Sequence, residues 1–410
     1  GATNMSGYFK TIGDLERATY GIGSDNILKS TGATSGIEGR HYSTGASGDA
    51  QTSELYNIVY GQKVWSMINR EINALSMLPK KPWKSSGWRM LKSRAIGGNA
   101  DSFSVSDADD LGGVAENVAL SAITNVKPDY TTLTVTPKTV AHTFEISEIA
   151  QMMAGLDDGI GDLIANYREE VGITHAEVMN AMVLQDLTTT AGVGLDHSGF
   201  SGADTILTPL YKIIANYAET NAMSNYANKN DLYGQTRASS GTEYLESYVD
   251  SNSGTERNLT VTLLNTALRN LMARGGDPKV ILTGYDTIQT LGELLQAQER
   301  FMGRTEVVPS HSGIKGVSGR EVGFRVATYH DIPIIPVKDM PNGGAGLSDM
   351  LILDTDHLFL CTLKPTEYFE GGINADVFGH GKLGHRGLYR TVAETVCTYF
   401  RGQGKIIDLQ

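Results

Sequence analysis

Residues 80–128 read KKPWKSSGWRMLKSRAIGGNADSFSVSDADDLGGVAENVALSAITNVKP, a stretch in which the charges are sorted by sign. The first part carries six cations and no acid: Lys80, Lys81, Lys84, Arg89, Lys92 and Arg94. The part between residues 95 and 120 carries five acids and no cation: Asp101, Asp107, Asp109, Asp110 and Glu116. Glycine pairs at 97–98 and 112–113 indicate turns. The pattern predicts a long two-stranded loop with a basic arm and an acidic arm.

This loop has a low apolar content, so it has little reason to fold back onto its own core. A hairpin that reaches over a neighbouring molecule explains both the low apolar content and the sorted charges. The alternative is a solvated hairpin whose two arms neutralise each other.

The segments before the loop predict an arm and a helix. Ser6–Tyr20 has the spacing of one short helix, and Gly21–Gly48 has almost no large apolar residue. Such a stretch cannot offset its ordering entropy alone, so it is a disordered linker or an arm that becomes ordered on another subunit. Ser53–Leu78 has apolar residues at helical spacing and ends at Pro79.

The segments after the loop predict a strand pair or one bent strand, followed by a long helix. Tyr130–Ile146 alternates in polarity, with a change of phase at Pro137 that requires a bulge or bend. Asp157–Leu187 carries an apolar stripe, with Asp157 or Asp158 as the N-terminal cap. About 30 helical residues span roughly 45 Å, more than a compact domain needs. Gly161 and Gly172 weaken this helix or allow another chain to approach it closely.

The remaining sequence predicts a polar region followed by an α/β block. Residues 188–258 are rich in Gly, Ser, Thr and Asn, with one short helical candidate at Leu207–Tyr217. Helices are expected at Leu264–Leu271 and Ile288–Leu295. Strands are expected at Val280–Leu282, Val322–Val326, Ile332–Val337, Met350–Leu353, Leu358–Leu363 and Leu388–Phe400.

Composition excludes several classes of protein. The net charge is −12, from 34 Lys and Arg against 46 Asp and Glu, and the first 50 residues supply no basic arm, so coating nucleic acid through its phosphates is excluded. Cys361 and Cys397 are expected as buried core residues in a reducing compartment. The longest apolar stretches are far shorter than the roughly 20 residues of a membrane-spanning helix, and no signal peptide is visible. Gly1 fits removal of an initiator methionine, trimming by a protease or a cloning remnant.

No motif predicts catalysis. Gly379–Gly384 matches a dinucleotide-binding fingerprint in letters, but a strand pattern follows it instead of a helix. Asp354-Thr-Asp356-His357 is expected to form a polar turn between two strands rather than a metal site. We therefore predict no catalytic residue, no cofactor-binding residue and no metal ligand.

The order of elements resembles that of the major capsid proteins of tailed bacteriophages and archaeal tailed viruses, which have the α+β Hong Kong 97-type fold. In that family an N-terminal arm leads to an extended β-hairpin loop, a peripheral domain with a long spine helix, an axial α/β domain and a returning strand. The resemblance covers essentially the whole chain and rests on this order. It implies an arm at 1–79, an extended loop at 80–127, a peripheral domain at 128–201, an axial domain at 202–374 and a return to the peripheral domain at 375–410.

The resemblance implies a structural protein that self-assembles into hexamers and pentamers, forming an icosahedral head around double-stranded DNA. It also implies the virion as location after assembly in the host cytoplasm, DNA without sequence-specific contact and no membrane. Decoration, scaffolding and portal proteins are further candidate partners. The expected contacts between subunits lie on the extended loop, at Trp83, Lys84, Trp88, Arg89, Lys92, Arg94, Phe103, Asp107, Asp109 and Asp110.

Two other functions remain open at this point. A soluble α/β hydrolase or oxidoreductase would form a small oligomer and have a concave pocket with perturbed carboxylates or histidines. A cellular nanocompartment of the same fold would enclose an enzyme instead of DNA.

The basic arm generates a first prediction. Reversing Arg89 and Lys92 to Glu should impair assembly and leave the monomer folded, because the arm is expected to pair with acids on a neighbouring subunit. Electron microscopy measures assembly and circular dichroism measures folding. Normal shells from the double variant would refute the pairing.

Overall fold

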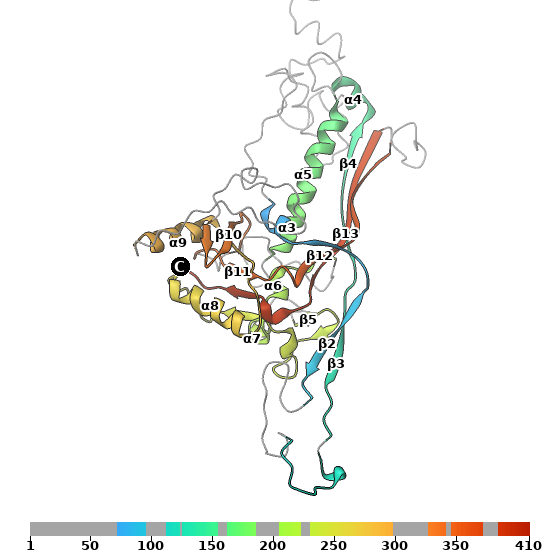
Figure 1. The fold of residues 1–410 in the computed structure, drawn as a ribbon. Helices are drawn as coiled ribbons and strands as arrows, with labels where there is room; N and C mark the ends of the chain where they lie inside the picture. Colours follow the sequence, from blue (N-terminus) through green and yellow to red (C-terminus); the bar gives the residue numbers. More distant parts are fainter. Residues whose placement is uncertain are drawn as a thin grey trace, which may run out of the picture. The chain divides into compact units, whose positions relative to one another are not determined.

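The computed structural model describes residues 72–95, 112–123, 125–154, 162–185, 205–222, 230–297, 327–341, 346–371 and 384–410 (Figure 1). They belong to two compact units. The smaller unit draws its described parts from Ala141–His175 and Thr366–Arg390, and the larger from Glu71–Val140, Ala176–Pro365 and Thr391–Gln410. Among the described residues, no helix is both long and apolar enough to cross a lipid bilayer.

The larger unit is built on a six-stranded sheet with the order β7-β14-β11-β8-β10-β9. β10 runs parallel to β8, whereas β11 runs antiparallel to both β8 and β14. Every residue of β8, β10 and β11 is buried, which explains why these strands are continuous apolar runs in the sequence. The strands are β7 (Tyr248–Asp250), β8 (Val280–Thr283), β9 (Ala327–Tyr329), β10 (Ile332–Pro336), β11 (Met350–Leu353) and β14 (Gly404–Ile406).

Each face of this sheet has its own core, because successive side chains of a strand point to opposite faces. Ile281, Ile334 and Ile352 belong to one cluster, together with helices α8 (Val261–Ala273) and α9 (Tyr285–Ala297). Their neighbours along the strands, such as Leu282, Ile335 and Leu351, belong to a second cluster. The predicted strands at 280–282, 332–337 and 350–353 and both predicted helices are confirmed, while the strand predicted at Val322–Val326 lies outside the described residues.

The polar region contributes directly to the second core. Leu207, Leu210 and Ile213 are fully buried, although Gly, Ser, Thr and Asn surround them in the sequence. The described part forms α6 (Leu210–Ile213), α7 (Tyr217–Ala222), β5 (Asp231–Leu232), β6 (Gln235–Thr236) and the 3₁₀ helix η5 (Glu243–Leu245). The short helix predicted at Leu207–Tyr217 is thus confirmed as α6, and α7 follows it.

A buried ion pair holds β14 against α7. The Nζ atom of Lys405 lies 2.6 Å from a carboxylate oxygen of Glu219, and the Lys405 side chain has no exposed surface. The same ammonium group lies 4.9 Å from the ring centroid of Tyr211. Removing one partner would leave an uncompensated charge in the core, so the pair fixes the relative position of these two elements.

A second sheet has the order β1-β12-β13-β4. Lys80–Pro82 is β1 and pairs with β12, so the chain remains in this sheet until Pro82. The Nζ atom of Lys80 donates to the carbonyl oxygens of Leu75 and Leu78, and burial lowers the pKa of Lys80 to about 8. The remaining elements are α3 (Asn73–Met77), β12 (Leu358–Gly371), β13 (Gly384–Cys397) and β4 (Lys138–Ser147).

The last predicted strand, Leu388–Phe400, ends earlier than expected. β13 stops at Cys397, and Phe400 starts a short 3₁₀ helix, η6 (Phe400–Gly402). Phe400 therefore lies outside β13 and does not share a face with its residues, but it is still fully buried. Of the helix predicted at Ser53–Leu78, the described residues hold only α3, and residues 1–71 of the predicted N-terminal arm lie outside them.

The smaller unit contains the start of the long helix α5 (Leu163–Val183), preceded by α4 (Glu148–Ala154). Asp162 caps α5, because its Oδ1 atom accepts a hydrogen bond of 3.1 Å from the N–H group of Ala165. This corrects the cap expected at Asp157 or Asp158, and those two residues lie outside the described ranges. The predicted long helix is confirmed over 21 residues.

Aromatic rings and one glycine pack this unit. Phe144 stacks on Tyr167 and on Tyr368, with ring centroids 6.0 and 6.3 Å apart. A Cβ atom at Gly172 would lie 3.0 Å from the hydroxyl oxygen of Tyr389, so this glycine accommodates a side chain of its own chain. The imidazoles of His142 and His175 meet with their Nδ1 atoms 2.7 Å apart.

A buried carboxyl group generates a second prediction, about pH. Glu394 on β13 is buried, and its Oε1 atom accepts N–H groups of Thr208 and Thr395 at 2.7 and 2.9 Å. Burial raises the pKa of Glu394 from 4.5 to about 7. A group whose folded pKa is raised contributes stability that is fully present below its unfolded pKa. That contribution is lost as the pH rises through the folded pKa.

We therefore expect Glu394→Gln to increase the free energy of unfolding at pH 8 by about 3 kcal/mol relative to its effect at pH 4. The amide keeps an oxygen that accepts the two N–H groups and carries no charge. Urea unfolding of the unassembled protein at several pH values measures this. Parallel pH profiles for the variant and the unaltered chain would contradict it.

Candidate assembly interface

The extended loop has a two-stranded stem, β2 (Gly87–Ser93) and β3 (Asp129–Thr134). The strands are antiparallel, with Gly87 opposite Thr134 and Ser93 opposite Asp129. In the described part of the chain the basic arm therefore pairs with β3, whereas the prediction placed it opposite the acidic arm, most of which lies outside the described residues. The physical reason is composition: β3 holds Tyr, Thr and Leu, which favour strands, whereas the acidic arm is rich in Asp, Ala and Gly.

The stem is attached to the core at the end opposite the loop. The ring of Trp88 lies edge-on to that of Tyr233, with centroids 5.3 Å apart. The N–H group of Thr134 donates to the carbonyl oxygen of Tyr233 at 2.8 Å. Gly87 allows the two strands to approach closely here, since a Cβ atom on it would lie 2.7 Å from the carbonyl oxygen of Leu133. These contacts fix the direction in which the hairpin leaves the core.

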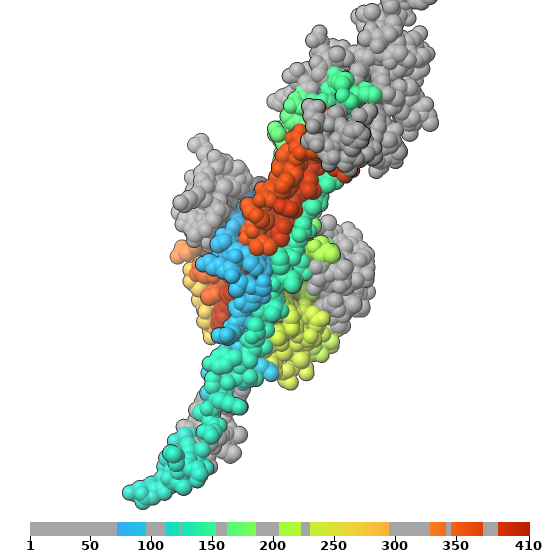
Figure 2. Space-filling model, turned by 90° about the vertical axis from the view of Figure 1, so that its right-hand side faces the viewer, coloured from blue at the N-terminus to red at the C-terminus, as the bar shows by residue number. Residues whose placement is uncertain are grey.

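The far end of the loop exposes its apolar side chains. Residues 112–123 lie beyond the open end of the stem, and each of them is exposed (Figures 1 and 2). Leu120, in the 3₁₀ turn η4 (Leu120–Ala122), exposes 86% of its surface. This apolar set consists of Val114, Val118, Leu120, Ile123 and Val126. Exposed apolar side chains grouped in this way mark an interaction surface.

The contacts predicted from the sequence did not include these apolar residues. Their signal is present, because five large aliphatic residues fall within positions 114–126, where no cation occurs. It was hidden by the surrounding Ala, Asn, Ser and Gly, which lower the average hydropathy. The apolar set makes the acidic arm a surface that needs covering.

The structure places the predicted contact residues in different settings. Trp83 and Trp88 are half-buried and pack against the core of their own chain. Lys84, Arg89, Lys92 and Arg94 are exposed. Lys92 lies 3.6 Å from Asp129 across the stem, an exposed pair that contributes little stability. Phe103, Asp107, Asp109 and Asp110 lie outside the described residues.

The residues considered for catalysis or metal binding lie in settings that fit a structural role. Cys397 is buried, and burial raises the pKa of its thiol to about 12. Burial also raises the pKa of the half-buried Cys361 thiol, so both remain protonated. Asp354 forms the predicted polar turn, where its Oδ1 atom accepts the N–H group of Asp356 at 3.1 Å. Within the described ranges, no group of three or more His, Cys, Asp and Glu residues is placed to hold a metal ion.

Comparison with known families identifies the class of protein. A model of the SU10 major capsid protein family matches residues 116–376, more than half of the 410 residues. The chain therefore belongs to the SU10 major capsid protein family. No curated protein sequence matches it.

Solved structures show the fold. The cyanophage A-1(L) capsid asymmetric unit is similar with a TM-score of 0.55 and 13% identity, covering 82% of this chain and 92% of that chain. The holo-SrpI encapsulin complex from Synechococcus elongatus PCC 7942 has a TM-score of 0.47 and 10% identity, covering 86% of this chain and 92% of that chain. Microbacterium phage Oxtober96 has a TM-score of 0.47 and 12% identity, covering 87% and 98%. Of these three, the cyanophage structure alone has a TM-score above 0.5, and the comparison of folds rests on it.

These comparisons confirm the main predictions. The protein has the Hong Kong 97-like fold and is a tailed-virus capsid protein, a structural component of the virion that assembles from copies of itself. Family membership also decides against the alternative of a soluble enzyme, since the family consists of capsid proteins. The division into five parts and the contact residues on the loop stay predictions.

The close approach at Gly87 generates a third prediction. Gly87→Ala should destabilise the stem by about 1–3 kcal/mol, because the new methyl group meets a backbone oxygen that cannot move without disturbing the strand pair. Gly292→Ala in α9 is the matched control. A Cβ atom there has no neighbour within 4 Å, so this helical substitution should be neutral or stabilising. Thermal unfolding compares them, and equal midpoints would contradict the prediction.

Proposed function

We propose that this capsid protein assembles into hexamers and pentamers that form an icosahedral head around the double-stranded DNA of a tailed virus. Each extended loop lies on the adjacent subunit of the same capsomer. The observation that carries the proposal is the apolar set on residues 114–126, which the described part of its own chain leaves exposed. A capsid protein that keeps such a surface in the monomer needs a second copy to cover it.

The free energy expected for one loop contact fits a contact that is repeated around a ring of subunits. Fully burying one Leu or Val side chain contributes roughly 1.5–3 kcal/mol. Several such side chains give one loop a few kcal/mol after the ordering cost of the contact, which is weak for one pair of subunits. In a closed ring each subunit gives one loop and receives another, so the weak contacts add up to a stable capsomer.

The five parts take the roles that the resemblance implies. The arm at 1–79 ties capsomers together, and the axial domain at 202–374 meets its copies at the capsomer centre. The loop at 80–127, the peripheral domain at 128–201 and the return at 375–410 complete the subunit. Because Lys80–Pro82 forms β1 and pairs with β12, the extended loop starts after Pro82 in this proposal.

The packaged DNA makes no sequence-specific contact in this proposal. With a net charge of −12, the shell offers the phosphates little attraction, so a motor must force the genome in. Assembly takes place in the host cytoplasm. Decoration, scaffolding and portal proteins are the further partners of such a head.

A fourth prediction tests the loop contact. Leu120→Ser should raise the protein concentration needed for assembly about tenfold or more, because the contact loses one buried leucine. The monomer should keep its stability, since Leu120 is exposed in it. Light scattering and electron microscopy measure assembly. Ser121→Ala, in the same turn, is the matched control, and an unchanged threshold for Leu120→Ser would overturn the proposed docking.

A further inference from the structure

An apolar pocket lies in the larger unit, at the base of the extended loop. Its volume is about 290 Å³, and its lining comes from the residues around the start of the stem, from β12 and from the end of β13. We call it the stem pocket. Its aromatic and aliphatic walls, together with one thiol, are formed by Trp83, Trp88, Val135, Phe359, Cys361 and Val396.

Hydrogen bonds within the chain hold the walls of the stem pocket together. The N–H group of Trp83 donates to the carbonyl oxygen of Thr362 on β12 at 3.0 Å. The N–H group of Val135 donates to the carbonyl oxygen of Ser86 at 2.8 Å, which closes the base of the stem. Because these bonds join the wall segments to each other, the pocket is preformed in the subunit, as binding pockets usually are.

The size of the stem pocket suits one or two aliphatic side chains. An apolar cavity of about 150 Å³ holds a benzene molecule, so a volume of about 290 Å³ accommodates a leucine with a smaller neighbour. The loop end offers side chains of this size, because Leu120 and Val118 are exposed. Leu120, at 86% exposure, is the more prominent of the two.

The charges beside the stem pocket and beside the loop end have opposite signs. Lys81 and Lys84 belong to the described lining of the pocket, and both are exposed. The Nζ atom of Lys81 lies 3.9 Å from the centroid of the Phe359 ring, which places a positive charge at the pocket wall. On the loop, five acids lie within 101–116, and Glu116 stands four residues before Leu120. A docked loop end therefore brings carboxylates towards ammonium groups.

The loop end of the same chain lies away from the stem pocket. The pocket is at the base of the stem, where Gly87 is opposite Thr134, and residues 112–123 lie beyond the open end (Figure 1). The seven residues of β2 separate the two ends of the stem by roughly 20 Å, at about 3.3 Å per residue. The loop end of a second copy is therefore the occupant that this geometry favours.

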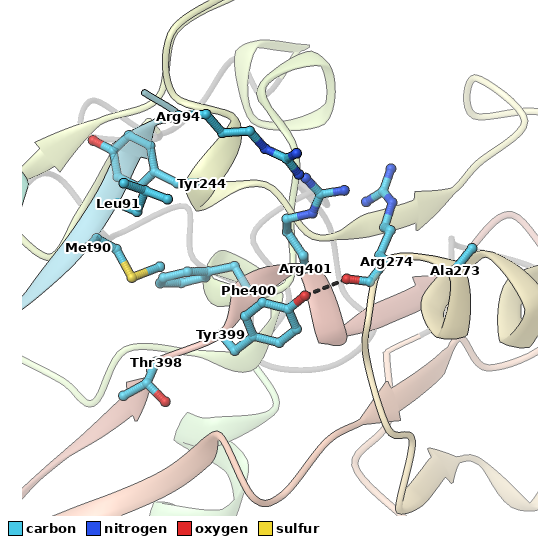
Figure 3. Close-up of a pocket in the computed structure, with 10 residues that line it drawn as sticks. All are labelled: Met90, Leu91, Arg94, Tyr244, Ala273, Arg274, Thr398, Tyr399, Phe400 and Arg401. Carbon is cyan, nitrogen blue, oxygen red and sulfur yellow. Dashed lines mark hydrogen bonds between the residues drawn. The ribbon is translucent and has the colours of Figure 1, made fainter. Parts of the chain in front are cut away.

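A second pocket shares Thr398 with the stem pocket but has a different lining. Its volume is about 360 Å³, and Figure 3 shows Arg94, Arg274 and Arg401 among its lining residues. The hydroxyl group of Tyr399 donates to the carbonyl oxygen of Arg274 there (Figure 3). An aliphatic side chain that entered this pocket would remove water from charged groups, which costs free energy. The stem pocket is the better receptor for the apolar set.

We propose that the stem pocket of one copy receives Leu120 of a second copy, with Glu116 of that loop facing Lys84. The inference rests on the proposed function and adds the receptor for the loop. An apolar side chain that fills a pocket walled by tryptophan and phenylalanine is the arrangement in which a few residues carry most of the binding energy of an interface.

Filling the stem pocket tests its role as receptor. Ser85 is exposed and lines the pocket, so Ser85→Trp should occupy the space that Leu120 needs. We expect it to raise the protein concentration needed for assembly about tenfold or more. Ser86→Trp is the matched control, because Ser86 is the next residue, is also exposed and lies outside the lining. It should leave the threshold within about threefold of that of the unaltered protein.

A chemical block gives the same test without a large substitution. Cys361 lines the stem pocket and is half-buried, whereas Cys397 is fully buried. N-ethylmaleimide on the folded, unassembled chain should therefore modify Cys361 and raise the assembly threshold in the same way as Ser85→Trp. Cys361→Ala, treated with the reagent, should assemble normally. Circular dichroism checks that each protein is folded, and the reagent decides the question if Ser85→Trp is unfolded.

Crosslinking identifies the occupant. Because a disulfide needs the two Cα atoms within about 7 Å, a short bis-maleimide reagent is used on assembled shells. Leu120→Cys should then be joined to the natural Cys361 of another copy, which gives covalent dimers and longer chains on a denaturing gel. These products should disappear when Cys361→Ala is added. They should stay absent when Ala273→Cys moves the thiol to the second pocket, where Ala273 is exposed.

The opposite outcomes are equally clear. Normal assembly with a filled or alkylated stem pocket would overturn its role as receptor. So would a crosslink within one chain, or one that forms only with Ala273→Cys. If Leu120→Ser impairs assembly while Ser85→Trp and the alkylated chain assemble normally, only this inference fails. If Leu120→Ser has no effect, the proposed docking of the loop fails with it.

Discussion

Tyr233 joins the extended loop to the core of the larger unit. It stands with Gly234 in the two-residue turn between β5 and β6, where both residues have positive φ angles, 50° and 76°. A tyrosine rarely adopts this conformation, so its surroundings must hold it. Its hydroxyl group donates to the carbonyl oxygen of Thr395 at 2.5 Å, and its ring contacts those of Trp88 and Phe400. One residue therefore links the stem, the closing strand and η6.

Charged groups are buried in the core, whereas apolar groups are exposed at the end of the loop. Inside the core, two buried cations have partners: Arg237 donates to the carbonyl oxygens of Lys212, Ile213 and Leu245, and Lys405 pairs with Glu219. At the end of the loop, apolar groups remain exposed in the described part of the chain. The subunit is thus complete in its interior and incomplete at its loop, as a self-assembling capsid protein requires.

Local patterns in the sequence predicted the local elements and failed at long-range pairing. β8, β10 and β11 were recognisable because every position is buried, and α8 because one face is. The partner of β2 was mispredicted, since charge sorting within 80–120 suggested a neighbour in sequence and not β3. The charged loop residues could be named in advance. The contact between Trp88 and Tyr233 could not, because it joins residues that lie far apart in the sequence.

Two different surfaces of one chain imply a head-to-tail contact. If the loop end of one copy meets a different surface of the next, the interface is heterologous, and such interfaces close into rings or continue as filaments according to the angle between copies. That angle depends on the direction in which the stem leaves the core. Trp88, Gly87 and the turn at Tyr233 set this direction. Ring closure in the capsomer is therefore decided by buried contacts that no neighbouring copy needs to touch.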